Sequence, residues 1–220
     1  IFNTTYFEDA VTIHEAAAPF RVHGAEMTED GLTDLILLGQ GETDEEAYLR
    51  VLQNDGLAGM TSLGDTAVSG IPVDAAIIDL NDNGFPDVAV VTVDEAGGAG
   101  TLRVFVSEQG GGFSETHTAS VGTDPSSIAV GNLDAGGLDL AVGTRGSGGD
   151  NGEVYFFSGD AAGSFAAAQV LAVEGEVSTV TMGRMFGNAD DIVAGYTDST
   201  GAHFPVSYTH LRAHETKANL

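Results

Sequence analysis

The sequence contains no cysteine, has a single lysine at Lys217, and carries no long apolar run. The absence of cysteine excludes a disulfide framework and thiol chemistry. It does not exclude secretion, because bound metal can replace disulfides as a stabilising cross-link. The longest apolar runs have the length of a strand, whereas a membrane-spanning helix needs about 18 to 20 residues, so we expect no membrane insertion.

Positive charge is also scarce. Seven Lys and Arg residues stand against 33 Asp and Glu, which gives a formal net charge of −26 at pH 7. Phosphate binding needs a basic surface, so nucleic acid and anionic membrane surfaces are excluded as partners. Self-repulsion of this size is tolerated where salt or divalent cations are abundant. The composition favours a halophilic or marine source, or a calcium-rich extracellular setting. We therefore place the protein outside the cell or on its surface, with the periplasm as the other compartment that fits.

Motifs of known catalytic sites are missing as well. The chain has no Gly-x-Ser-x-Gly elbow, no His-Glu-x-x-His and no Gly-rich loop followed by Lys-Ser/Thr. Its histidines are scattered, and we interpret His14 and His117 as surface residues of strands. We therefore predict no catalytic residue in this chain.

The most informative segment that is present reads Asp79-Leu-Asn-Asp-Asn-Gly-Phe-Pro-Asp87. Oxygen-bearing side chains occupy its positions one, three, five and nine, namely Asp79, Asn81, Asn83 and Asp87. Gly84 stands at the tight sixth position. A hard cation such as Ca²⁺ takes about six to eight oxygen ligands and turns the self-repulsion of such a loop into attraction. An EF-hand would need flanking helices and a Glu at the twelfth position, where this sequence has Val90. Short apolar runs flank the loop instead, so we predict that it joins two strands.

The same arrangement recurs at intervals of 52 or 53 residues. The acid that ends the loop recurs as Asp34, Asp87, Asp139 and Asp191, each followed by an apolar run. Other landmarks keep the same phase, namely Phe7, Met60, Phe113 and Phe165, and also Pro19, Pro72 and Pro125. A further strand-like stretch begins fifteen residues after each of the first three acids. One period thus holds four short strands separated by Gly, Asp and Ser turns.

Four-stranded repeats of about this length are typical of β-propeller blades. We therefore predict an all-β fold, a partial β-propeller of about four four-stranded blades of ~52 residues, with the fourth blade incomplete. The predicted blades span approximately residues 7–59, 60–112, 113–164 and 165–204, within a domain of residues 1–204. A sandwich with coincidentally spaced turns is the alternative.

These repeats resemble the FG-GAP or VCBS-type repeats of integrin α-subunit propellers and of bacterial and archaeal surface proteins, over roughly residues 7–204. The resemblance is strongest in residues 79–87 and in Asp124-Pro-Ser-Ser-Ile-Ala-Val-Gly-Asn-Leu-Asp134. It implies a calcium site at Asp79, Asn81, Asn83 and Asp87, with the carbonyl of Phe85 as a further ligand. It also implies a closed ring of about seven blades, of which this chain would supply a part.

The other three loops match the family pattern less well. The first offers Glu26, Thr28, Asp30 and Asp34, and its opening Glu is longer than the pattern prefers. We expect a weaker calcium site there. The third loop, residues 132–139, is one residue short and has Gly136 where a ligand belongs. The fourth, residues 184–191, places Arg184 and apolar groups at ligand positions. We predict no metal in these last two loops.

Residues 206–220 resemble the translated read-through of a transposon-based sequencing adapter. The repeat breaks here, since the last strand of the fourth period should begin at position 206. We interpret residues 205–220 as a non-native tail and exclude them from fold reasoning, including the pair His210 and His214. A strand formed by Val206 and its neighbours would be accidental. On this interpretation the chain is a fragment of a longer reading frame.

These observations favour a non-catalytic extracellular calcium-binding propeller segment that acts as an interaction or adhesion scaffold for a protein or glycan ligand. The alternative is an accessory or catalytic propeller fragment of a larger secreted polysaccharide-degrading enzyme. The complete reading frame would separate the two.

Overall fold

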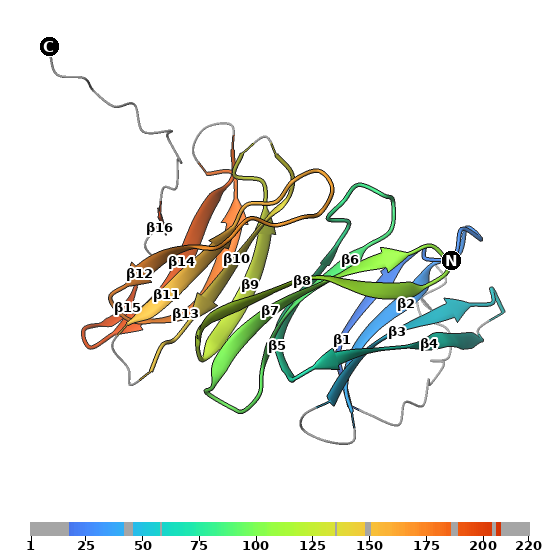
Figure 1. Cartoon of the computed structure of the whole chain (residues 1–220), viewed down its shortest axis with the longest axis horizontal. Coiled ribbons are helices and arrows are strands. Elements are labelled where there is room, and N and C mark those ends of the chain that lie inside the picture. The colour runs from blue at the N-terminus through green and yellow to red at the C-terminus, as the bar shows by residue number, and fades with distance from the viewer. Residues whose placement is uncertain are drawn as a thin grey trace, which may run out of the picture.

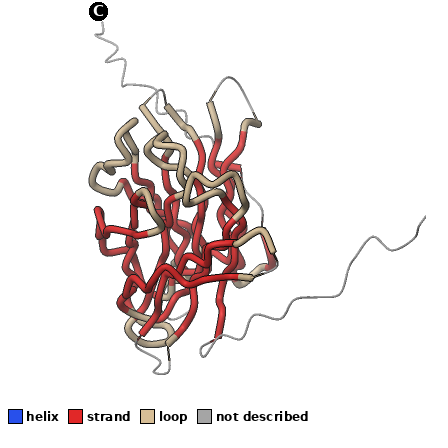
Figure 2. Tube along the Cα trace, turned by 90° about the vertical axis from the view of Figure 1, so that its right-hand side faces the viewer, coloured by secondary structure: helices blue, strands red, loops and turns tan. Residues whose placement is uncertain are grey.

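The computed structural model describes residues 18–41, 46–57, 59–134, 136–147, 151–185, 189–203 and 206–207. Every regular element in these residues is a β-strand (Figure 2). Within the same residues, no helix has the length and apolarity that crossing a membrane requires. The all-β prediction is therefore confirmed.

The strands form four sheets, and each sheet is described by its strands in chain order. The first holds β1 (Ala18–Ala25), β2 (Asp34–Gln40), β3 (Glu46–Asn54) and β4 (Met60–Ser69). The second holds β5 (Ile71–Ile78), β6 (Asp87–Val93), β7 (Ala99–Glu108) and β8 (Gly112–Thr123). The third holds β9 (Pro125–Gly131), β10 (Asp139–Thr144), β11 (Gly152–Phe157) and β12 (Gln169–Val173). The fourth holds β13 (Glu176–Gly183), β14 (Asp191–Asp198), β15 (Gly201–His203) and β16 (Val206–Ser207).

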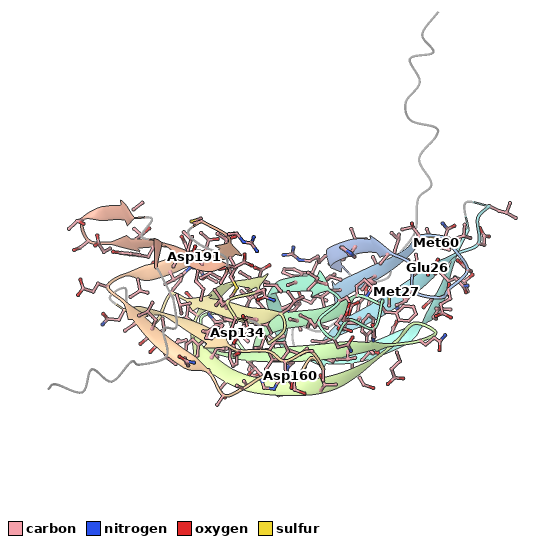
Figure 3. All side chains as sticks on the ribbon, turned by 90° about the horizontal axis from the view of Figure 1, so that it is seen from above. Glu26, Met27, Met60, Asp134, Asp160 and Asp191 are labelled. Carbon is pink, nitrogen blue, oxygen red and sulfur yellow. The ribbon has the colours of Figure 1, made fainter. Side chains whose placement is uncertain are left out.

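The first three sheets are antiparallel meanders in which each strand pairs with its neighbour in the sequence. In the fourth sheet β13, β14 and β15 follow the same order, and β16 pairs with β14. The sheets follow one another from the N-terminal to the C-terminal end of the molecule (Figure 1). Seen from above, they form a curved row (Figure 3). The first strands are neighbours along this row, since β5 contacts β1 and β9, and β9 contacts β13.

The apolar runs predicted from the sequence are the second strands β2, β6, β10 and β14, and the stretches fifteen residues later are the third strands β3, β7 and β11. The sheets have the predicted period but a different starting point. The second predicted blade begins at Met60. In the structure Met60 begins β4, which is the last strand of the first sheet. Phe7 lies outside the described residues.

The core fills the spaces between consecutive sheets. Val88 and Val90 of β6 belong to a buried cluster shared with the first sheet, while Ala89 and Val91 belong to one shared with the third. All four side chains are fully buried. A strand covered on both faces has no polar face, which explains why β6 reads as a continuous apolar run. Leu140 and Val142 of β10 belong to the same cluster as Ala89 and Val91.

The first strand of each sheet carries a register shift at an equivalent position. The shifts lie between Pro19 and Arg21, between Pro72 and Asp74, opposite Gly143 and Thr144, and between Val177 and Thr179. A bulge re-aims the residues that follow it. Here those residues make bonds between sheets: Asp74 Oδ2 accepts from the Ile128 backbone N–H at 3.0 Å, and Ser127 Oγ accepts from the Val180 N–H at 2.8 Å. Asp74 also pairs with Arg21 of the first sheet.

His117 corrects one expectation. We predicted a surface residue, but His117 of β8 is half-buried and faces the third sheet. Its ring centroid lies 6.1 Å from that of Phe157 and 5.6 Å from that of Phe165. Burial lowers the pKa of His117. The polar sequence around His117 gives no sign that this face of β8 covers a neighbouring sheet.

Candidate calcium loops

The second loop, residues 79–86, connects β5 to β6, as predicted for a loop between two strands. Its side-chain oxygens are held inward by backbone N–H groups. Asp79 Oδ1 accepts from Asn83 N at 3.1 Å and Oδ2 from Gly84 N at 2.8 Å. Asn81 Oδ1 accepts from Asn83 N at 3.1 Å, and Asn83 Oδ1 from Phe85 N at 2.8 Å. Three predicted ligand side chains are thereby fixed around one turn of chain.

The backbone of this turn is shared with the first loop. Asp82 and Gly84 have φ values of 57° and 92°, and Glu29 and Gly31, 53 residues earlier, have 60° and 80°. Left-handed backbone is accessible to glycine without the steric penalty that a Cβ brings, which accounts for Gly31 and Gly84. The two loops predicted to bind calcium therefore have the same turn.

The first loop, residues 26–33, contains a buried acceptor without a donor. Glu26 Oε1 accepts from Thr28 N at 3.0 Å and Asp30 N at 3.3 Å. Glu26 Oε2 is buried, and no donor among the described residues reaches it. An unsatisfied buried carboxylate oxygen is costly, and a cation is one partner that would satisfy it. The donor set of this loop fits a hard cation on this ground.

Thr28 and Asp30 of the first loop form side-chain hydrogen bonds with residues of β2 and β3. Thr28 Oγ1 donates to Asp34 Oδ2 at 3.2 Å, and Gln53 of β3 donates to Asp30 Oδ2 at 3.2 Å. The backbone N–H of Leu32, first, and then the amide of Gln53 lower the pKa of Asp30. Asp30 thus stays ionised and available to a cation at neutral pH.

The loop-ending aspartates have a role that the sequence did not reveal. Asp34, Asp87, Asp139 and Asp191 are fully buried. In each, Oδ2 accepts from a backbone N–H near the start of its own loop: Met27 at 3.0 Å, Leu80 at 2.8 Å, Leu133 at 2.6 Å and Met185 at 3.1 Å. In the first three, Oδ1 accepts from a backbone N–H twenty residues further on: Asn54 at 2.9 Å, Ser107 at 2.8 Å and Gly159 at 2.9 Å. The aspartate clamps the start of the loop to the end of the third strand.

Asp139 forms the same clamp in the third loop, where the ligand pattern is broken, so the clamp does not require a complete set of ligand residues. A carboxylate oxygen has two lone pairs, so Asp87 Oδ2 retains one beyond its bond to Leu80. Burial, first, and then the nearby charge of Asp79 raise the pKa of Asp87. A cation beside Asp79 and Asp87 would offset both effects.

Protein groups already occupy the third and fourth loops. Asp134 accepts from Gly136 N at 2.6 Å and from Ser158 Oγ at 3.1 Å. Asn132, equivalent to Asp79, donates its N–H to Asp190 Oδ2 at 2.8 Å, and its carbonyl accepts from Asp190 N at 2.9 Å. Residues 186–188 of the fourth loop lie outside the described residues.

The predicted ligands do not all converge. Within the part of the chain that the structure describes, no three His, Cys, Asp or Glu side chains gather as a metal site. Glu26, Asp30 and Asp34 therefore do not form a three-carboxylate cluster. The predicted ligand sets also include amide, hydroxyl and carbonyl oxygens. At Phe85, the backbone N–H donates to Asn83 Oδ1.

A shallow cavity of about 350 Å³ crosses β1, β5 and β9. Arg21 and His23 line it together with apolar residues such as Val22, Ile78 and Ile128. This lining does not include a carboxylate that could act with His23 as an acid and base pair.

In comparisons with known proteins, neither a family model nor a curated protein matches this chain. The resemblance to FG-GAP and VCBS-type repeats therefore rests on the spacing of the loops and landmarks.

Proposed function

We propose that this chain is part of a calcium-stabilised β-propeller of the FG-GAP or VCBS type, which acts outside the cell as a non-catalytic scaffold and presents its loops to a protein or glycan ligand. The observation that carries the calcium assignment is Glu26 Oε2, a buried carboxylate oxygen that no described donor reaches. The shared turn of the first two loops supports extending the assignment to Asp79, Asn81, Asn83 and Asp87.

Calcium would supply a hard divalent centre for six to eight oxygens. The protein's own contribution is to hold those oxygens in place. Asp79 is oriented by two backbone N–H groups, and Asp87 by the clamp to Leu80 and Ser107. Affinity of about 10⁻⁴ to 10⁻³ M is usual for extracellular calcium modules.

The propeller assignment draws on the repeated junctions between sheets. Each first strand has its bulge at the same place, and the residues after it bond to the next first strand. Repetition of one junction between four-stranded sheets is what successive propeller blades require. The curved row would then be an arc of a larger ring (Figure 3).

Thermal unfolding with and without calcium tests the proposal. The buffer is chelated first, and sodium chloride holds ionic strength constant. At 100 times the Kd, binding adds about 2.7 kcal/mol per site, a Tm rise of roughly 5 to 10 °C for a chain of this size. A Tm that does not respond to calcium would remove the proposed role.

Two variants assign the effect to the loops. The double variant Glu26→Gln with Asp79→Asn should lose the calcium response. The control Asp134→Asn removes one carboxylate from the third loop and should keep the response. Equal responses in both variants would place calcium elsewhere.

A further inference from the structure

The connection between the third and fourth strands of a sheet reaches back to the candidate calcium loop of the preceding sheet. In the second sheet this connection is residues 109–111, where Gln109 Nε2 donates to Glu29 Oε2 of the first loop at 2.6 Å. In the third sheet it is residues 158–168, where a Cβ added to Gly163 would lie 3.0 Å from Asn81 Cβ of the second loop. We call these two connections the latches.

The two latches are built alike. Gly111 and Gly163 lie 52 residues apart, both are buried, and their φ values are 90° and 73°. A Cβ at Gly111 would meet Leu63 Cδ1 of the first sheet at 2.6 Å. Each latch therefore brings a left-handed glycine against the preceding sheet, where an added Cβ would be crowded.

The second latch is ordered by its own hydrogen bonds. Asp160 Oδ1 accepts from the N–H groups of Ala162 and Ser164, both at 2.9 Å. The Asp160 N–H donates to the Ser164 carbonyl at 2.9 Å, and Gly163 N donates to the Asp160 carbonyl at 3.0 Å. These bonds fix the turn that lies against Asn81.

The contacts fall on ligand-bearing parts of the loops. Asn81 is the third-position ligand of the second loop. Glu29 lies between Thr28 and Asp30, and it occupies the left-handed position that shapes the turn. The first latch therefore holds the side chain of a turn residue, and the second lies against the side chain of a predicted ligand.

We propose that the latches couple ion binding in the first two loops to the junctions between sheets one and two and between sheets two and three. This inference rests on the proposed calcium function. A cation tightens the loop against the latch, and by thermodynamic reciprocity an intact latch raises the affinity for the cation. At the junction between sheets three and four, Asn132 and Asp190 bond directly to each other.

Isothermal titration with calcium tests the coupling at the second loop, in a Glu26→Gln background that removes the first site. The test variant is Gly163→Ala. Its control is Gly97→Ala, because Gly97 has a φ of 74° and no atom within 4 Å of an added Cβ. Both variants add a Cβ to a glycine with left-handed backbone. The Cβ of Gly163→Ala would lie against Asn81 of the second loop, whereas that of Gly97→Ala would contact nothing. We expect affinity to fall about fivefold or more in Gly163→Ala relative to Gly97→Ala, as for two coupled sites.

The first loop provides a second test that leaves the latch glycines unchanged. In an Asp79→Asn background, Gln109→Ala removes the bond to Glu29 at an exposed position and should weaken calcium binding. Hydrogen exchange of residues 160–164 should slow when calcium is added to the unmodified chain.

The outcomes separate the two proposals. Absence of calcium binding in the unmodified chain overturns the proposed function and the coupling together. Calcium binding with equal affinities in Gly163→Ala and Gly97→Ala, and no effect of Gln109→Ala, overturns the coupling alone. If Gly163→Ala fails to fold in chelated buffer, Gln109→Ala and the exchange measurement decide.

Discussion

Replacing Asp139 by alanine should destabilise the protein strongly and independently of calcium. Asp139 is fully buried, and its two oxygens accept from Leu133 N at 2.6 Å and Gly159 N at 2.9 Å. Alanine leaves both backbone N–H groups buried without an acceptor. Each such group costs about 1–3 kcal/mol, so we expect a loss of about 2–6 kcal/mol. A domain is typically stable by about 5–15 kcal/mol, so the effect is large.

Urea unfolding in chelated buffer measures this loss, with the free energy taken from the midpoint and slope of the transition. Asp139→Asn provides an intermediate case, because an amide keeps one acceptor and should lose about 1–3 kcal/mol. Asp94→Ala is the control for charge, since Asp94 is exposed. A surface change of this kind usually stays within about 0.5 kcal/mol.

Two results would refute the clamp. The first is that Asp139→Ala unfolds at the same urea concentration as Asp94→Ala, which would mean that the two N–H groups find other partners. The second is that the loss disappears when calcium is added, which would make Asp139 part of an ion site. The clamp requires the same loss with and without calcium.

Three further predictions follow from the same geometry. Burial raises the pKa of Asp87 and of Asp139 above the ordinary value of 3.8, so the folded state binds these protons more tightly than the unfolded state. In chelated buffer, the stability that these two groups contribute should therefore rise as pH falls from neutral toward 3.8, and urea midpoints across pH should show this as a difference between the unmodified chain and Asp139→Asn. Lowering pH through the same range should weaken calcium binding, measured by titration, because the Asp87 carboxylate becomes protonated. His117→Phe should leave Tm unchanged or raise it, since no described donor or acceptor reaches His117 Nε2 and a phenyl ring keeps the packing on Phe157; a lower Tm would reveal a polar partner.

The periodic features could be predicted from the sequence because they are local. A second strand buried on both faces reads as an uninterrupted apolar run, as in β6, and the loop before it ends in an acid. Counting from that acid located the second and third strands of three sheets. The structure also forms a strand at Val206, where β16 pairs with β14.

The clamp could not be predicted in the same way, because its second partner is a backbone N–H twenty residues away. An acid at the end of a polar loop resembles a cation ligand, and that was the interpretation of Asp34 and Asp87. One signal was present in the sequence. The acid is present at Asp139 and Asp191, although the other ligand residues are missing from those two loops. An acid that is kept in a loop without the other ligands indicates a structural role.

The latches escaped prediction for a related reason. Gly111 and Gly163 recur at the period of the repeat, but glycine is abundant in this chain, with 31 residues, so two more glycines in phase carry little weight. Their meaning depends on which sheet they touch. Contacts between repeats leave no pattern within one repeat.

The charge distribution explains why loops of this kind are suited to divalent cations. Four arginines are already engaged in ion pairs, namely Arg21 with Asp74, Arg50 with Asp65, Arg103 with Glu115 and Arg145 with Asp124. Exposed pairs contribute about 0–1 kcal/mol each, so they organise neighbouring strands more than they stabilise the whole. With 33 acids against seven Lys and Arg, most carboxylates have no basic side chain to pair with. Sodium reduces their repulsion only by screening, whereas calcium bound at Glu26 or Asp79 would neutralise charge and supply bonds at one place. Calcium should therefore stabilise the chain more than sodium at equal ionic strength, and the excess should vanish in the double variant of Glu26 and Asp79 while the sodium effect remains.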